Sequence, residues 1–216
     1  MSYQPIENYG IIGDLNTTAL VGLNGSIDFM CFPRFDSPSI FAALLDDRKG
    51  GSYRISPVFK EMKTKQLYLP DTNVLLTRFL SSEGVAEVVD FMPVDPNGEK
   101  RLIRRVTTIR GEVKFQLQCC PRFEYAKKPH KVVPASAQEI NFQVDNGPDL
   151  SLRLKASVSL STANADAGAE FTLRAGESAA FLLESAANED ARDQDLMEMV
   201  AASLARTINY WKDWMS

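Results

Sequence analysis

Apolar and polar residues alternate with a period of two through most of the chain, which is the spacing of side chains on one face of a β-strand. The clearest run spans 113–118, where Val113, Phe115 and Leu117 alternate with polar neighbours. Similar runs lie at 140–144, 150–161, 171–173 and 181–183. The segments 73–80 and 85–91 are apolar more continuously, which indicates strands covered on both faces. The sequence therefore predicts a mainly β protein.

Turn-forming dipeptides separate these runs and indicate how the strands connect. They are Asn24-Gly25, Glu83-Gly84, Arg110-Gly111, Asn146-Gly147 and Ala175-Gly176. We expect consecutive strands to pair mostly as hairpins, because the spacing from 51 to 184 leaves little room for crossover helices. The pattern predicts two antiparallel sheets packed face to face, a two-layer β-sandwich, over 1–187. The one early helical candidate is a turn or two at 39–46.

The C-terminal segment from Asn188 onward has helical periodicity instead. One apolar stripe recurs at spacings of three and four and comprises Leu196, Val200, Leu204, Ile208, Trp211 and Met215. Glu189 and Asp190 suit the first turn, where carboxylates oppose the helix dipole. No Gly or Pro cap precedes Ser216. We predict a linker helix over 188–216 whose stripe packs on the domain's own sheet or on something beyond the last residue.

Composition excludes several classes of protein. Hydrophobic residues make up 44% and charged residues 24%, the balance of an ordinary globular domain. A net charge of −4 argues against a nucleic-acid partner, which requires a concentrated positive surface. The longest apolar stretches, such as 40–45, are too short to cross a bilayer, and the N-terminus lacks a signal pattern. We therefore predict a cytoplasmic protein without a membrane partner.

The sequence contains few candidates for catalytic chemistry. Its single histidine, His130, lies among lysines, and no nucleophile elbow or phosphate-binding loop is present. Cys31, Cys119 and Cys120 lack the spacing of metal ligands and are expected to be buried free thiols. The 28 acidic residues cannot be paired into a hydrolytic site from sequence alone. We expect no catalytic residue, metal or cofactor, and the residues alone leave the function open.

A long stretch near the N-terminus carries a family resemblance. The segments PIENYGIIGD (5–14), TALVG (18–22), GSID (25–28) and CFPRFDSPSIF (31–41) resemble the opening of bacterial family-fifteen glycoside hydrolases, the glucoamylase-like and trehalase-like enzymes. Gly50-Gly51 and DFMP (90–93) extend the resemblance, whereas 125–185 matches only in its strand rhythm. YWKDW (210–214) resembles the helix with paired tryptophans that leads out of the sandwich. One departure is Phe29, where the family often has Trp.

This resemblance implies a β-sandwich domain of the super-sandwich type, joined through a linker helix to an (α/α)₆ barrel. In the family, two glutamates of the barrel hydrolyse α-glucosidic bonds with inversion. Neither glutamate can be assigned here, because the barrel would begin after Ser216. The resemblance thus implies a non-catalytic domain that is inactive alone, whose partners are the barrel in cis and an α-glucoside at the interface.

The loop between Pro33 and Pro38 is the main candidate for that interface, since two prolines stiffen it. We hypothesise that Arg34, Phe35 and Asp36 face the catalytic barrel, where they brace it and reach the rim of its sugar pocket. The alternative is that Arg34 and Asp36 only brace the loop by local hydrogen bonds. Trp211 and Trp214 are the corresponding docking candidates on the C-terminal helix.

Two other functions stay open at this point. An independent carbohydrate-binding module would use exposed aromatic residues such as Tyr53, Tyr68 or Tyr125 to stack on a pyranose ring. A protein-interaction element would instead present the tryptophan-bearing helix to another chain. The sequence does not indicate which glucoside is cleaved, the natural length of the protein, its oligomeric state, or any need for phosphate or magnesium.

Overall fold

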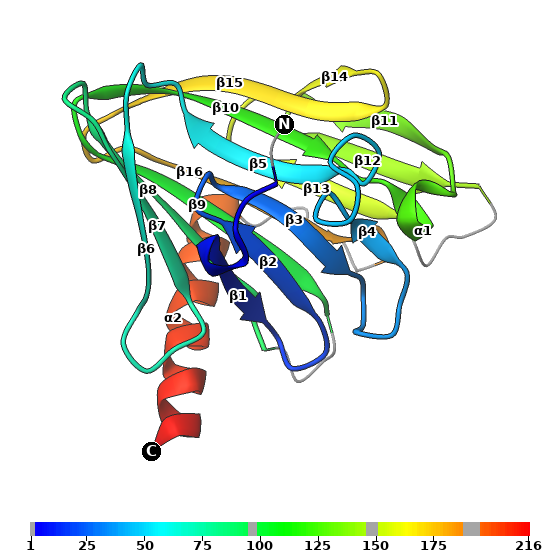
Figure 1. Cartoon of the computed structure of the whole chain (residues 1–216), viewed down its shortest axis with the longest axis horizontal. Helices are drawn as coiled ribbons and strands as arrows, with labels where there is room; N and C mark the ends of the chain where they lie inside the picture. The colour runs from blue at the N-terminus through cyan, green and yellow to red at the C-terminus, as the bar shows by residue number, and fades with distance from the viewer. Residues whose placement is uncertain (1–2, 95–98, 146–150, 188–194) are drawn as a thin grey trace.

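Two antiparallel sheets lie face to face, and one long helix covers part of the outer face of one of them (Figure 1). This architecture comes from a computed structural model that describes residues 3–94, 99–145, 151–187 and 195–216. The predicted two-layer β-sandwich with a C-terminal helix is confirmed.

The strands of the first sheet, sheet A, run in the order β1 (Tyr9–Gly13), β2 (Thr18–Gly22), β3 (Ser26–Cys31), β5 (Ser52–Pro57), β10 (Glu112–Cys120), β15 (Asp166–Arg174) and β14 (Ser161–Ala163), and β4 (Ser39–Phe41) pairs with β3. The strands of the second sheet, sheet B, run in the order β11 (His130–Ser136), β12 (Glu139–Val144), β13 (Leu152–Ala156), β16 (Ser178–Ser185), β9 (Arg101–Arg110), β8 (Val85–Phe91), β7 (Leu75–Leu80) and β6 (Lys63–Tyr68). The helical elements are η1 (Ile6–Asn8), the single turn α1 (Phe123–Ala126) and α2 (Leu196–Met215).

One long antiparallel ribbon runs through both sheets and lies at the centre of sheet B. Strand β9 passes through Gly111 into β10 and thereby changes sheet, and β15 passes through Gly176 into β16 and changes back. Because β9 pairs with β16 and β10 with β15, the two strand pairs are one ribbon bent at its middle. Both glycines have a left-handed φ, +83° at Gly111 and +88° at Gly176, which permits the bend.

The turn predictions are therefore only partly right. Asn24-Gly25 joins the paired strands β2 and β3, and Glu83-Gly84 joins the paired strands β7 and β8, as expected for hairpins. The hairpins expected at Arg110-Gly111 and Ala175-Gly176 are wrong, because the chain crosses there from one sheet to the other. A glycine with positive φ suits either connection, so the dipeptide alone does not distinguish them. Asn146-Gly147 lies outside the described residues.

Alternation correctly identified the strands with one buried face. Val113, Phe115 and Leu117 lie in the core between the sheets, and the polar residues between them are exposed. Two other expectations are wrong. The run 150–161 is not one strand, since β13 ends at Ala156 and β14 belongs to the other sheet. The segment 39–46 begins as strand β4 rather than a helix, because Ile40 and Phe41 are both buried beside β3.

Helix α2 packs on the outer face of sheet B. Its N-cap is Asp195, whose Oδ1 accepts hydrogen bonds from the backbone N–H groups of Met197 (2.7 Å) and Glu198 (3.0 Å). Val200 is fully buried in an apolar cluster with Phe91 of β8 and residues of β9 and β16. The domain's own sheet is thus the partner of the first part of the stripe. The predicted start at 188, including Glu189 and Asp190, lies outside the described residues.

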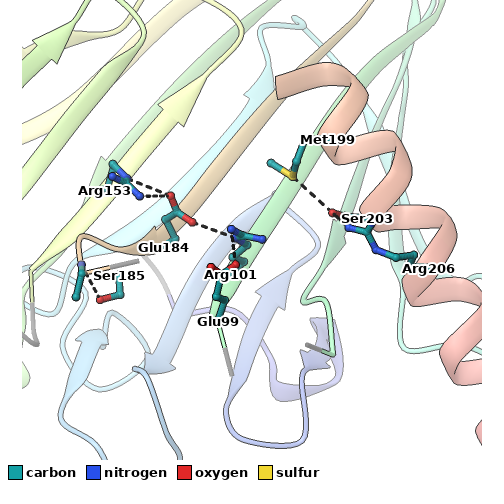
Figure 2. Close-up of polar contacts among 9 residues, drawn as sticks. Glu99, Arg101, Arg153, Glu184, Ser185, Met199, Ser203 and Arg206 are labelled. Atoms are coloured by element: carbon teal, nitrogen blue, oxygen red, sulfur yellow. Dashed lines mark hydrogen bonds and ion pairs between the residues drawn. The ribbon is translucent and has the colours of Figure 1, made fainter. Parts of the chain in front are cut away.

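A charged ladder lies beside α2 on the same face of sheet B (Figure 2). Arg153, Glu184 and Arg101 align in register on the neighbouring strands β13, β16 and β9. Glu184 is buried and accepts from Arg153 Nη2 at 2.8 Å and from Arg101 Nε at 3.1 Å, and Arg101 also pairs with Glu99. Opposite charges placed directly across strands stabilise the pairing, so this part of the outer face is held by ions rather than by apolar contact.

A second ion pair ties the two sheets together through the core. Arg104 of β9 and Asp90 of β8 are both fully buried, with Arg104 Nε 2.7 Å from Asp90 Oδ1. The guanidinium also donates to the backbone oxygens of Tyr53 (2.6 Å) and Gly25 (2.8 Å) in sheet A. A buried charge is tolerated when it is paired and its donors are satisfied, as they are here.

Candidate functional site

Two neighbouring loops form a rim at one end of the sandwich (Figure 1). The first, residues 14–17, joins β1 to β2, and the second, residues 32–38, joins β3 to β4. The Phe35 N–H donates to the Asn16 carbonyl at 2.8 Å, and the Thr17 hydroxyl donates to the Cys31 carbonyl. These bonds lock the two loops into one unit, which we call the loop rim.

The loop rim presents two large apolar side chains to solvent. Leu15 is 53% exposed and Phe35 is 58% exposed, one from each loop. Leu15 also has a left-handed φ of +69°, a conformation that costs a branched residue about 1–2 kcal/mol. The exposure of Leu15 means that little burial in this domain offsets that strain. Strained, exposed apolar residues on a stiff frame are typical of a contact surface.

Arg34 and Asp36 are hydrogen-bonded to each other within the loop, which is the local brace expected as the alternative to docking. Arg34 Nε lies 3.0 Å from Asp36 Oδ1, and the Arg34 backbone exchanges hydrogen bonds with Ser37. Both side chains are largely exposed, so the ion pair itself contributes little to stability. The Arg34–Asp36 pair therefore fixes the loop's shape and leaves both charged groups accessible to a partner.

A buried carboxylate shapes the first loop of the rim. Asp14 is almost fully buried, and its Oδ1 accepts from the backbone N–H groups of Asn16 (2.9 Å) and Thr17 (2.8 Å). Its Oδ2 lies 3.5 Å from Lys100 Nζ at the start of β9. Sequence reasoning missed both residues. The signal available was an Asp three residues before a Thr, which is typical of an Asx turn.

A groove of about 480 Å³ lies between the last turn of α2 and the loop that joins β6 to β7. We call it the helix-end groove, and it is lined by residues 68–73 with Trp211, Trp214 and Met215. The two predicted tryptophans differ sharply. Trp211 is 8% exposed, whereas Trp214 is 63% exposed, and their rings are nearly perpendicular at 5.7 Å. In the described part of the chain, the buried Trp211 Nε1 donates to no acceptor.

The helix-end groove is connected to the loop rim through edge strand β1. The Tyr68 hydroxyl accepts from the Ile11 N–H at 2.8 Å and donates to the Ile11 carbonyl at 2.9 Å. Asn73 Oδ1 accepts from the Gly13 N–H at 2.6 Å. Because β1 leads directly into the first rim loop, the groove and the rim belong to one rigid frame.

The aromatic residues predicted for sugar stacking lie in different places. Tyr53 is fully buried under the Arg104 guanidinium, so its predicted exposure is wrong. Tyr68 and Tyr125 are both partly exposed. Tyr125 lies in the α1 turn, where residues 124–126 all have left-handed φ, and its N–H donates to Ser39 Oγ at 3.1 Å beside the rim. Alternation at 52–55 fits this burial, because Tyr53 and Ile55 share the inward face of β5 and their polar neighbours Ser52 and Arg54 do not.

Two titratable groups outside the rim have shifted pKa values. His130 lies between Phe123 and Phe142, and burial lowers the pKa of its imidazole. Burial, with the nearby Asp166 carboxylate, raises the pKa of the Cys120 thiol to about 12. Within the described ranges, no group of three His, Cys, Asp or Glu side chains is placed to hold a metal ion. A search of the helices in those ranges finds none that is both long and apolar enough to span a bilayer.

Comparison with known proteins finds similarity to a trehalase-like domain family and to parts of trehalases. A family model described as "Trehalase-like, N-terminal" matches residues 1–198. Trehalase 1 of Sulfolobus acidocaldarius is 49% identical over 116 residues, which cover 54% of this chain and 19% of that protein. The trehalase of Mycolicibacterium smegmatis is 28% identical over 99% of this chain, which corresponds to 35% of its own length.

A solved chain titled "Putative kojibiose phosphorylase from human microbiome" matches 94% of this chain and 33% of its own, with 9% identity and a TM-score of 0.49. The matched parts of the chain correspond to between a fifth and about a third of the lengths of the two trehalases.

Proposed function

Since this chain belongs to the trehalase-like N-terminal domain family, we propose that it is the non-catalytic N-terminal domain of a cytoplasmic hydrolase that cleaves an α-glucoside. The curated relatives cited above are trehalases, so trehalose is the substrate proposed for the whole protein. The domain braces an (α/α)₆ catalytic barrel in the same polypeptide, and its loop rim approaches the sugar pocket. The isolated chain is then inactive toward trehalose.

The exposure of Leu15 and Phe35 on two interlocked loops is the observation that carries this proposal. Apolar side chains held on a stiff frame fit a permanent partner, because their burial on docking costs little conformational entropy. Arg34 and Asp36 flank Phe35 and are exposed, so they supply the polar edge of such an interface. The same two groups are suited to hydrogen bonds with sugar hydroxyls, which makes an α-glucoside at the interface part of the proposal.

The test is a double substitution, Arg34→Ala with Asp36→Ala, in the full-length gene product. We expect kcat/KM for trehalose to fall at least about tenfold, roughly the loss of one or two charge-assisted hydrogen bonds. The matched control is Lys131→Ala with Asp145→Ala, an exposed ion pair at the far edge of sheet B, which should change nothing. Unchanged stability and turnover in the Arg34 and Asp36 variant would refute docking through this loop.

A simpler observation tests the parentage itself. The genomic sequence downstream of Ser216 should continue in frame for several hundred residues, encode mostly helices and contain two suitably spaced glutamates. An authentic stop codon at that point would favour a free-standing module instead.

The second candidate function is a carbohydrate-binding module, which the partly exposed rings of Tyr68 and Tyr125 favour. Titration of the isolated chain with trehalose, maltose and longer glucans distinguishes the two. A saturable signal at these rings would support the module, whereas no binding is expected from a domain that acts through its barrel. A protein-interaction element would instead show concentration-dependent association by light scattering.

A further inference from the structure

We infer that the helix-end groove is occupied by the polypeptide segment that directly follows Ser216, which packs against Trp214 and Met215. This inference rests on the proposed function and identifies where the next part of the polypeptide first makes contact. It concerns a different surface from the loop rim, so the two contacts are separable by experiment.

The first argument is the way α2 is held. Val200 is fully buried on sheet B and Trp211 is 8% exposed, so the helix is fixed to the domain along most of its length. Its last turn nevertheless carries Trp214 and Met215, which are 63% and 62% exposed. Figure 1 shows this end of α2 projecting past the strands that it crosses. A helix end that remained in water would favour polar side chains at these positions.

The second argument is the chemistry of the groove. Leu69, Pro70 and Met215 make its wall largely apolar, and Asp71 and Thr72 lie at its polar edge. Trp211 Nε1 is buried without an acceptor among the described residues, which is an unfavourable state for an indole donor. The Trp214 ring is the aromatic neighbour of Trp211 at 5.7 Å. Any peptide segment carries backbone carbonyls, which are the kind of acceptor that the Trp211 donor lacks, and packing in the groove would cover its apolar wall.

The third argument identifies the occupant. The family model ends at residue 198, whereas α2 continues to Met215, so the helix extends past the matched domain. The Mycolicibacterium smegmatis trehalase matches 99% of this chain with only 35% of its own length, so such relatives contain much more polypeptide. A segment tethered at Ser216 starts beside the groove at a high effective concentration. A separate protein or second copy would lose translational freedom to bind there.

The test compares oxidative footprinting of the isolated chain with that of the full-length gene product, read by mass spectrometry at single residues. We expect oxidation of Trp214 and Met215 to be at least tenfold slower in the full-length protein. Met62 is the internal control, because it is partly exposed in a different groove and should react equally in both forms. The Trp214→Ala variant should keep the isolated chain folded, since that side chain is mostly exposed.

Two outcomes separate this inference from the proposed function. If the full-length protein cleaves trehalose but Trp214 and Met215 oxidise equally fast in both forms, the groove assignment is overturned and the proposed function stands. If the gene product has no catalytic portion, both fall. Protection of Trp214 in the isolated chain, by rising protein concentration or by added trehalose, would identify a second copy or a sugar as the occupant and also overturn the inference.

Discussion

The Arg104 guanidinium of sheet B donates a hydrogen bond to the Gly25 carbonyl of sheet A across 2.8 Å. Gly25 has a φ of +78° in the β2–β3 turn, and a Cβ there would lie 2.2 Å from the Ile55 carbonyl oxygen. The turn that the sequence identified by its Asn-Gly dipeptide is therefore held from the opposite sheet. Asp90 keeps the guanidinium in place.

This arrangement predicts that removing either charge is severe. Arg104→Met leaves a buried Asp90 carboxylate without its partner, which typically costs about 3–5 kcal/mol of unfolding free energy. Urea denaturation of the isolated chain measures the loss. Asp90→Leu combined with Arg104→Met should recover part of it, because no unpaired charge then remains. A loss below about 1 kcal/mol for Arg104→Met would contradict a role in joining the sheets.

His130 predicts a pH dependence of stability. Its folded-state pKa is lowered from 6.5 by burial, so between that lowered value and 6.5 the unfolded chain binds more protons. The free energy of unfolding should rise with pH through this window and show no contribution from His130 above it. His130→Gln should flatten the dependence there. The protein has one histidine, so an NMR titration of its imidazole signal gives the pKa directly. A value at or above 6.5 would disprove the expected shift.

The three cysteines should be unreactive in the native protein. Burial raises the pKa of Cys120 to about 12, and it also raises the pKa values of Cys31 and Cys119. At pH 8 the Cys120 thiolate fraction is then on the order of a thousandfold below that of a free cysteine. Ellman's reagent should detect three thiols only after denaturation. Rapid labelling of one native thiol would show that its surroundings are more open than described.

Substitution of Leu15 separates the stability of this domain from its proposed docking to the catalytic barrel. Leu15→Gly removes the left-handed strain at an exposed site, so the isolated chain should become more stable by about 0.5–1 kcal/mol. The matched control is Leu67→Gly, an exposed leucine within β6, which should destabilise. In the full-length protein, this domain and the proposed catalytic barrel should unfold less cooperatively when Leu15 is replaced by Gly. Calorimetry measures this change. A destabilised isolated variant would mean that Leu15 contributes to this domain's own packing.

Alternating apolar and polar residues predicted the strands that have one buried face and one solvent-exposed face. Val113 to Leu117 satisfied that condition because their strand has solvent on one side. Arg153 occupies a polar position of the predicted run 150–161, which predicts an exposed side chain. It is nevertheless buried, because it forms an ion pair with Glu184, a residue distant in sequence. Pairing of this kind is a tertiary contact, and periodicity contains no information about it.

The residues that form the helix were predicted correctly, but the side of the helix that faces sheet B was not fully predicted. Ser203 and Thr207 face the sheet and are buried, whereas Leu204 and Ile208 are only partly covered. Small side chains let the helix approach closely, and the Thr207 hydroxyl is satisfied by the Ser203 carbonyl at 2.8 Å. A hydrophobicity pattern assigns small polar residues such as Ser203 and Thr207 to the solvent-exposed face.

The candidate site was predicted as one loop and is built from two. Proline spacing and family resemblance led to Phe35. The involvement of Leu15 depends on the bond between the Phe35 N–H and the Asn16 carbonyl. A backbone contact of that kind has no sequence signature. The contrast between a covered Trp211 and an exposed Trp214 likewise follows from where the helix passes the edge of sheet B.

The bent ribbon at the centre of the sandwich has a consequence for biosynthesis. Its first arm, residues 101–120, finds its partner only when residues 166–185 have left the ribosome. Until then β9 and β10 each have one unpaired backbone edge, and such edges are prone to aggregate. Non-local pairing of this kind also slows folding. The nascent chain is therefore most vulnerable after residues 101–120 have emerged and before residues 166–185 have done so, and chaperone capture should be strongest in that interval.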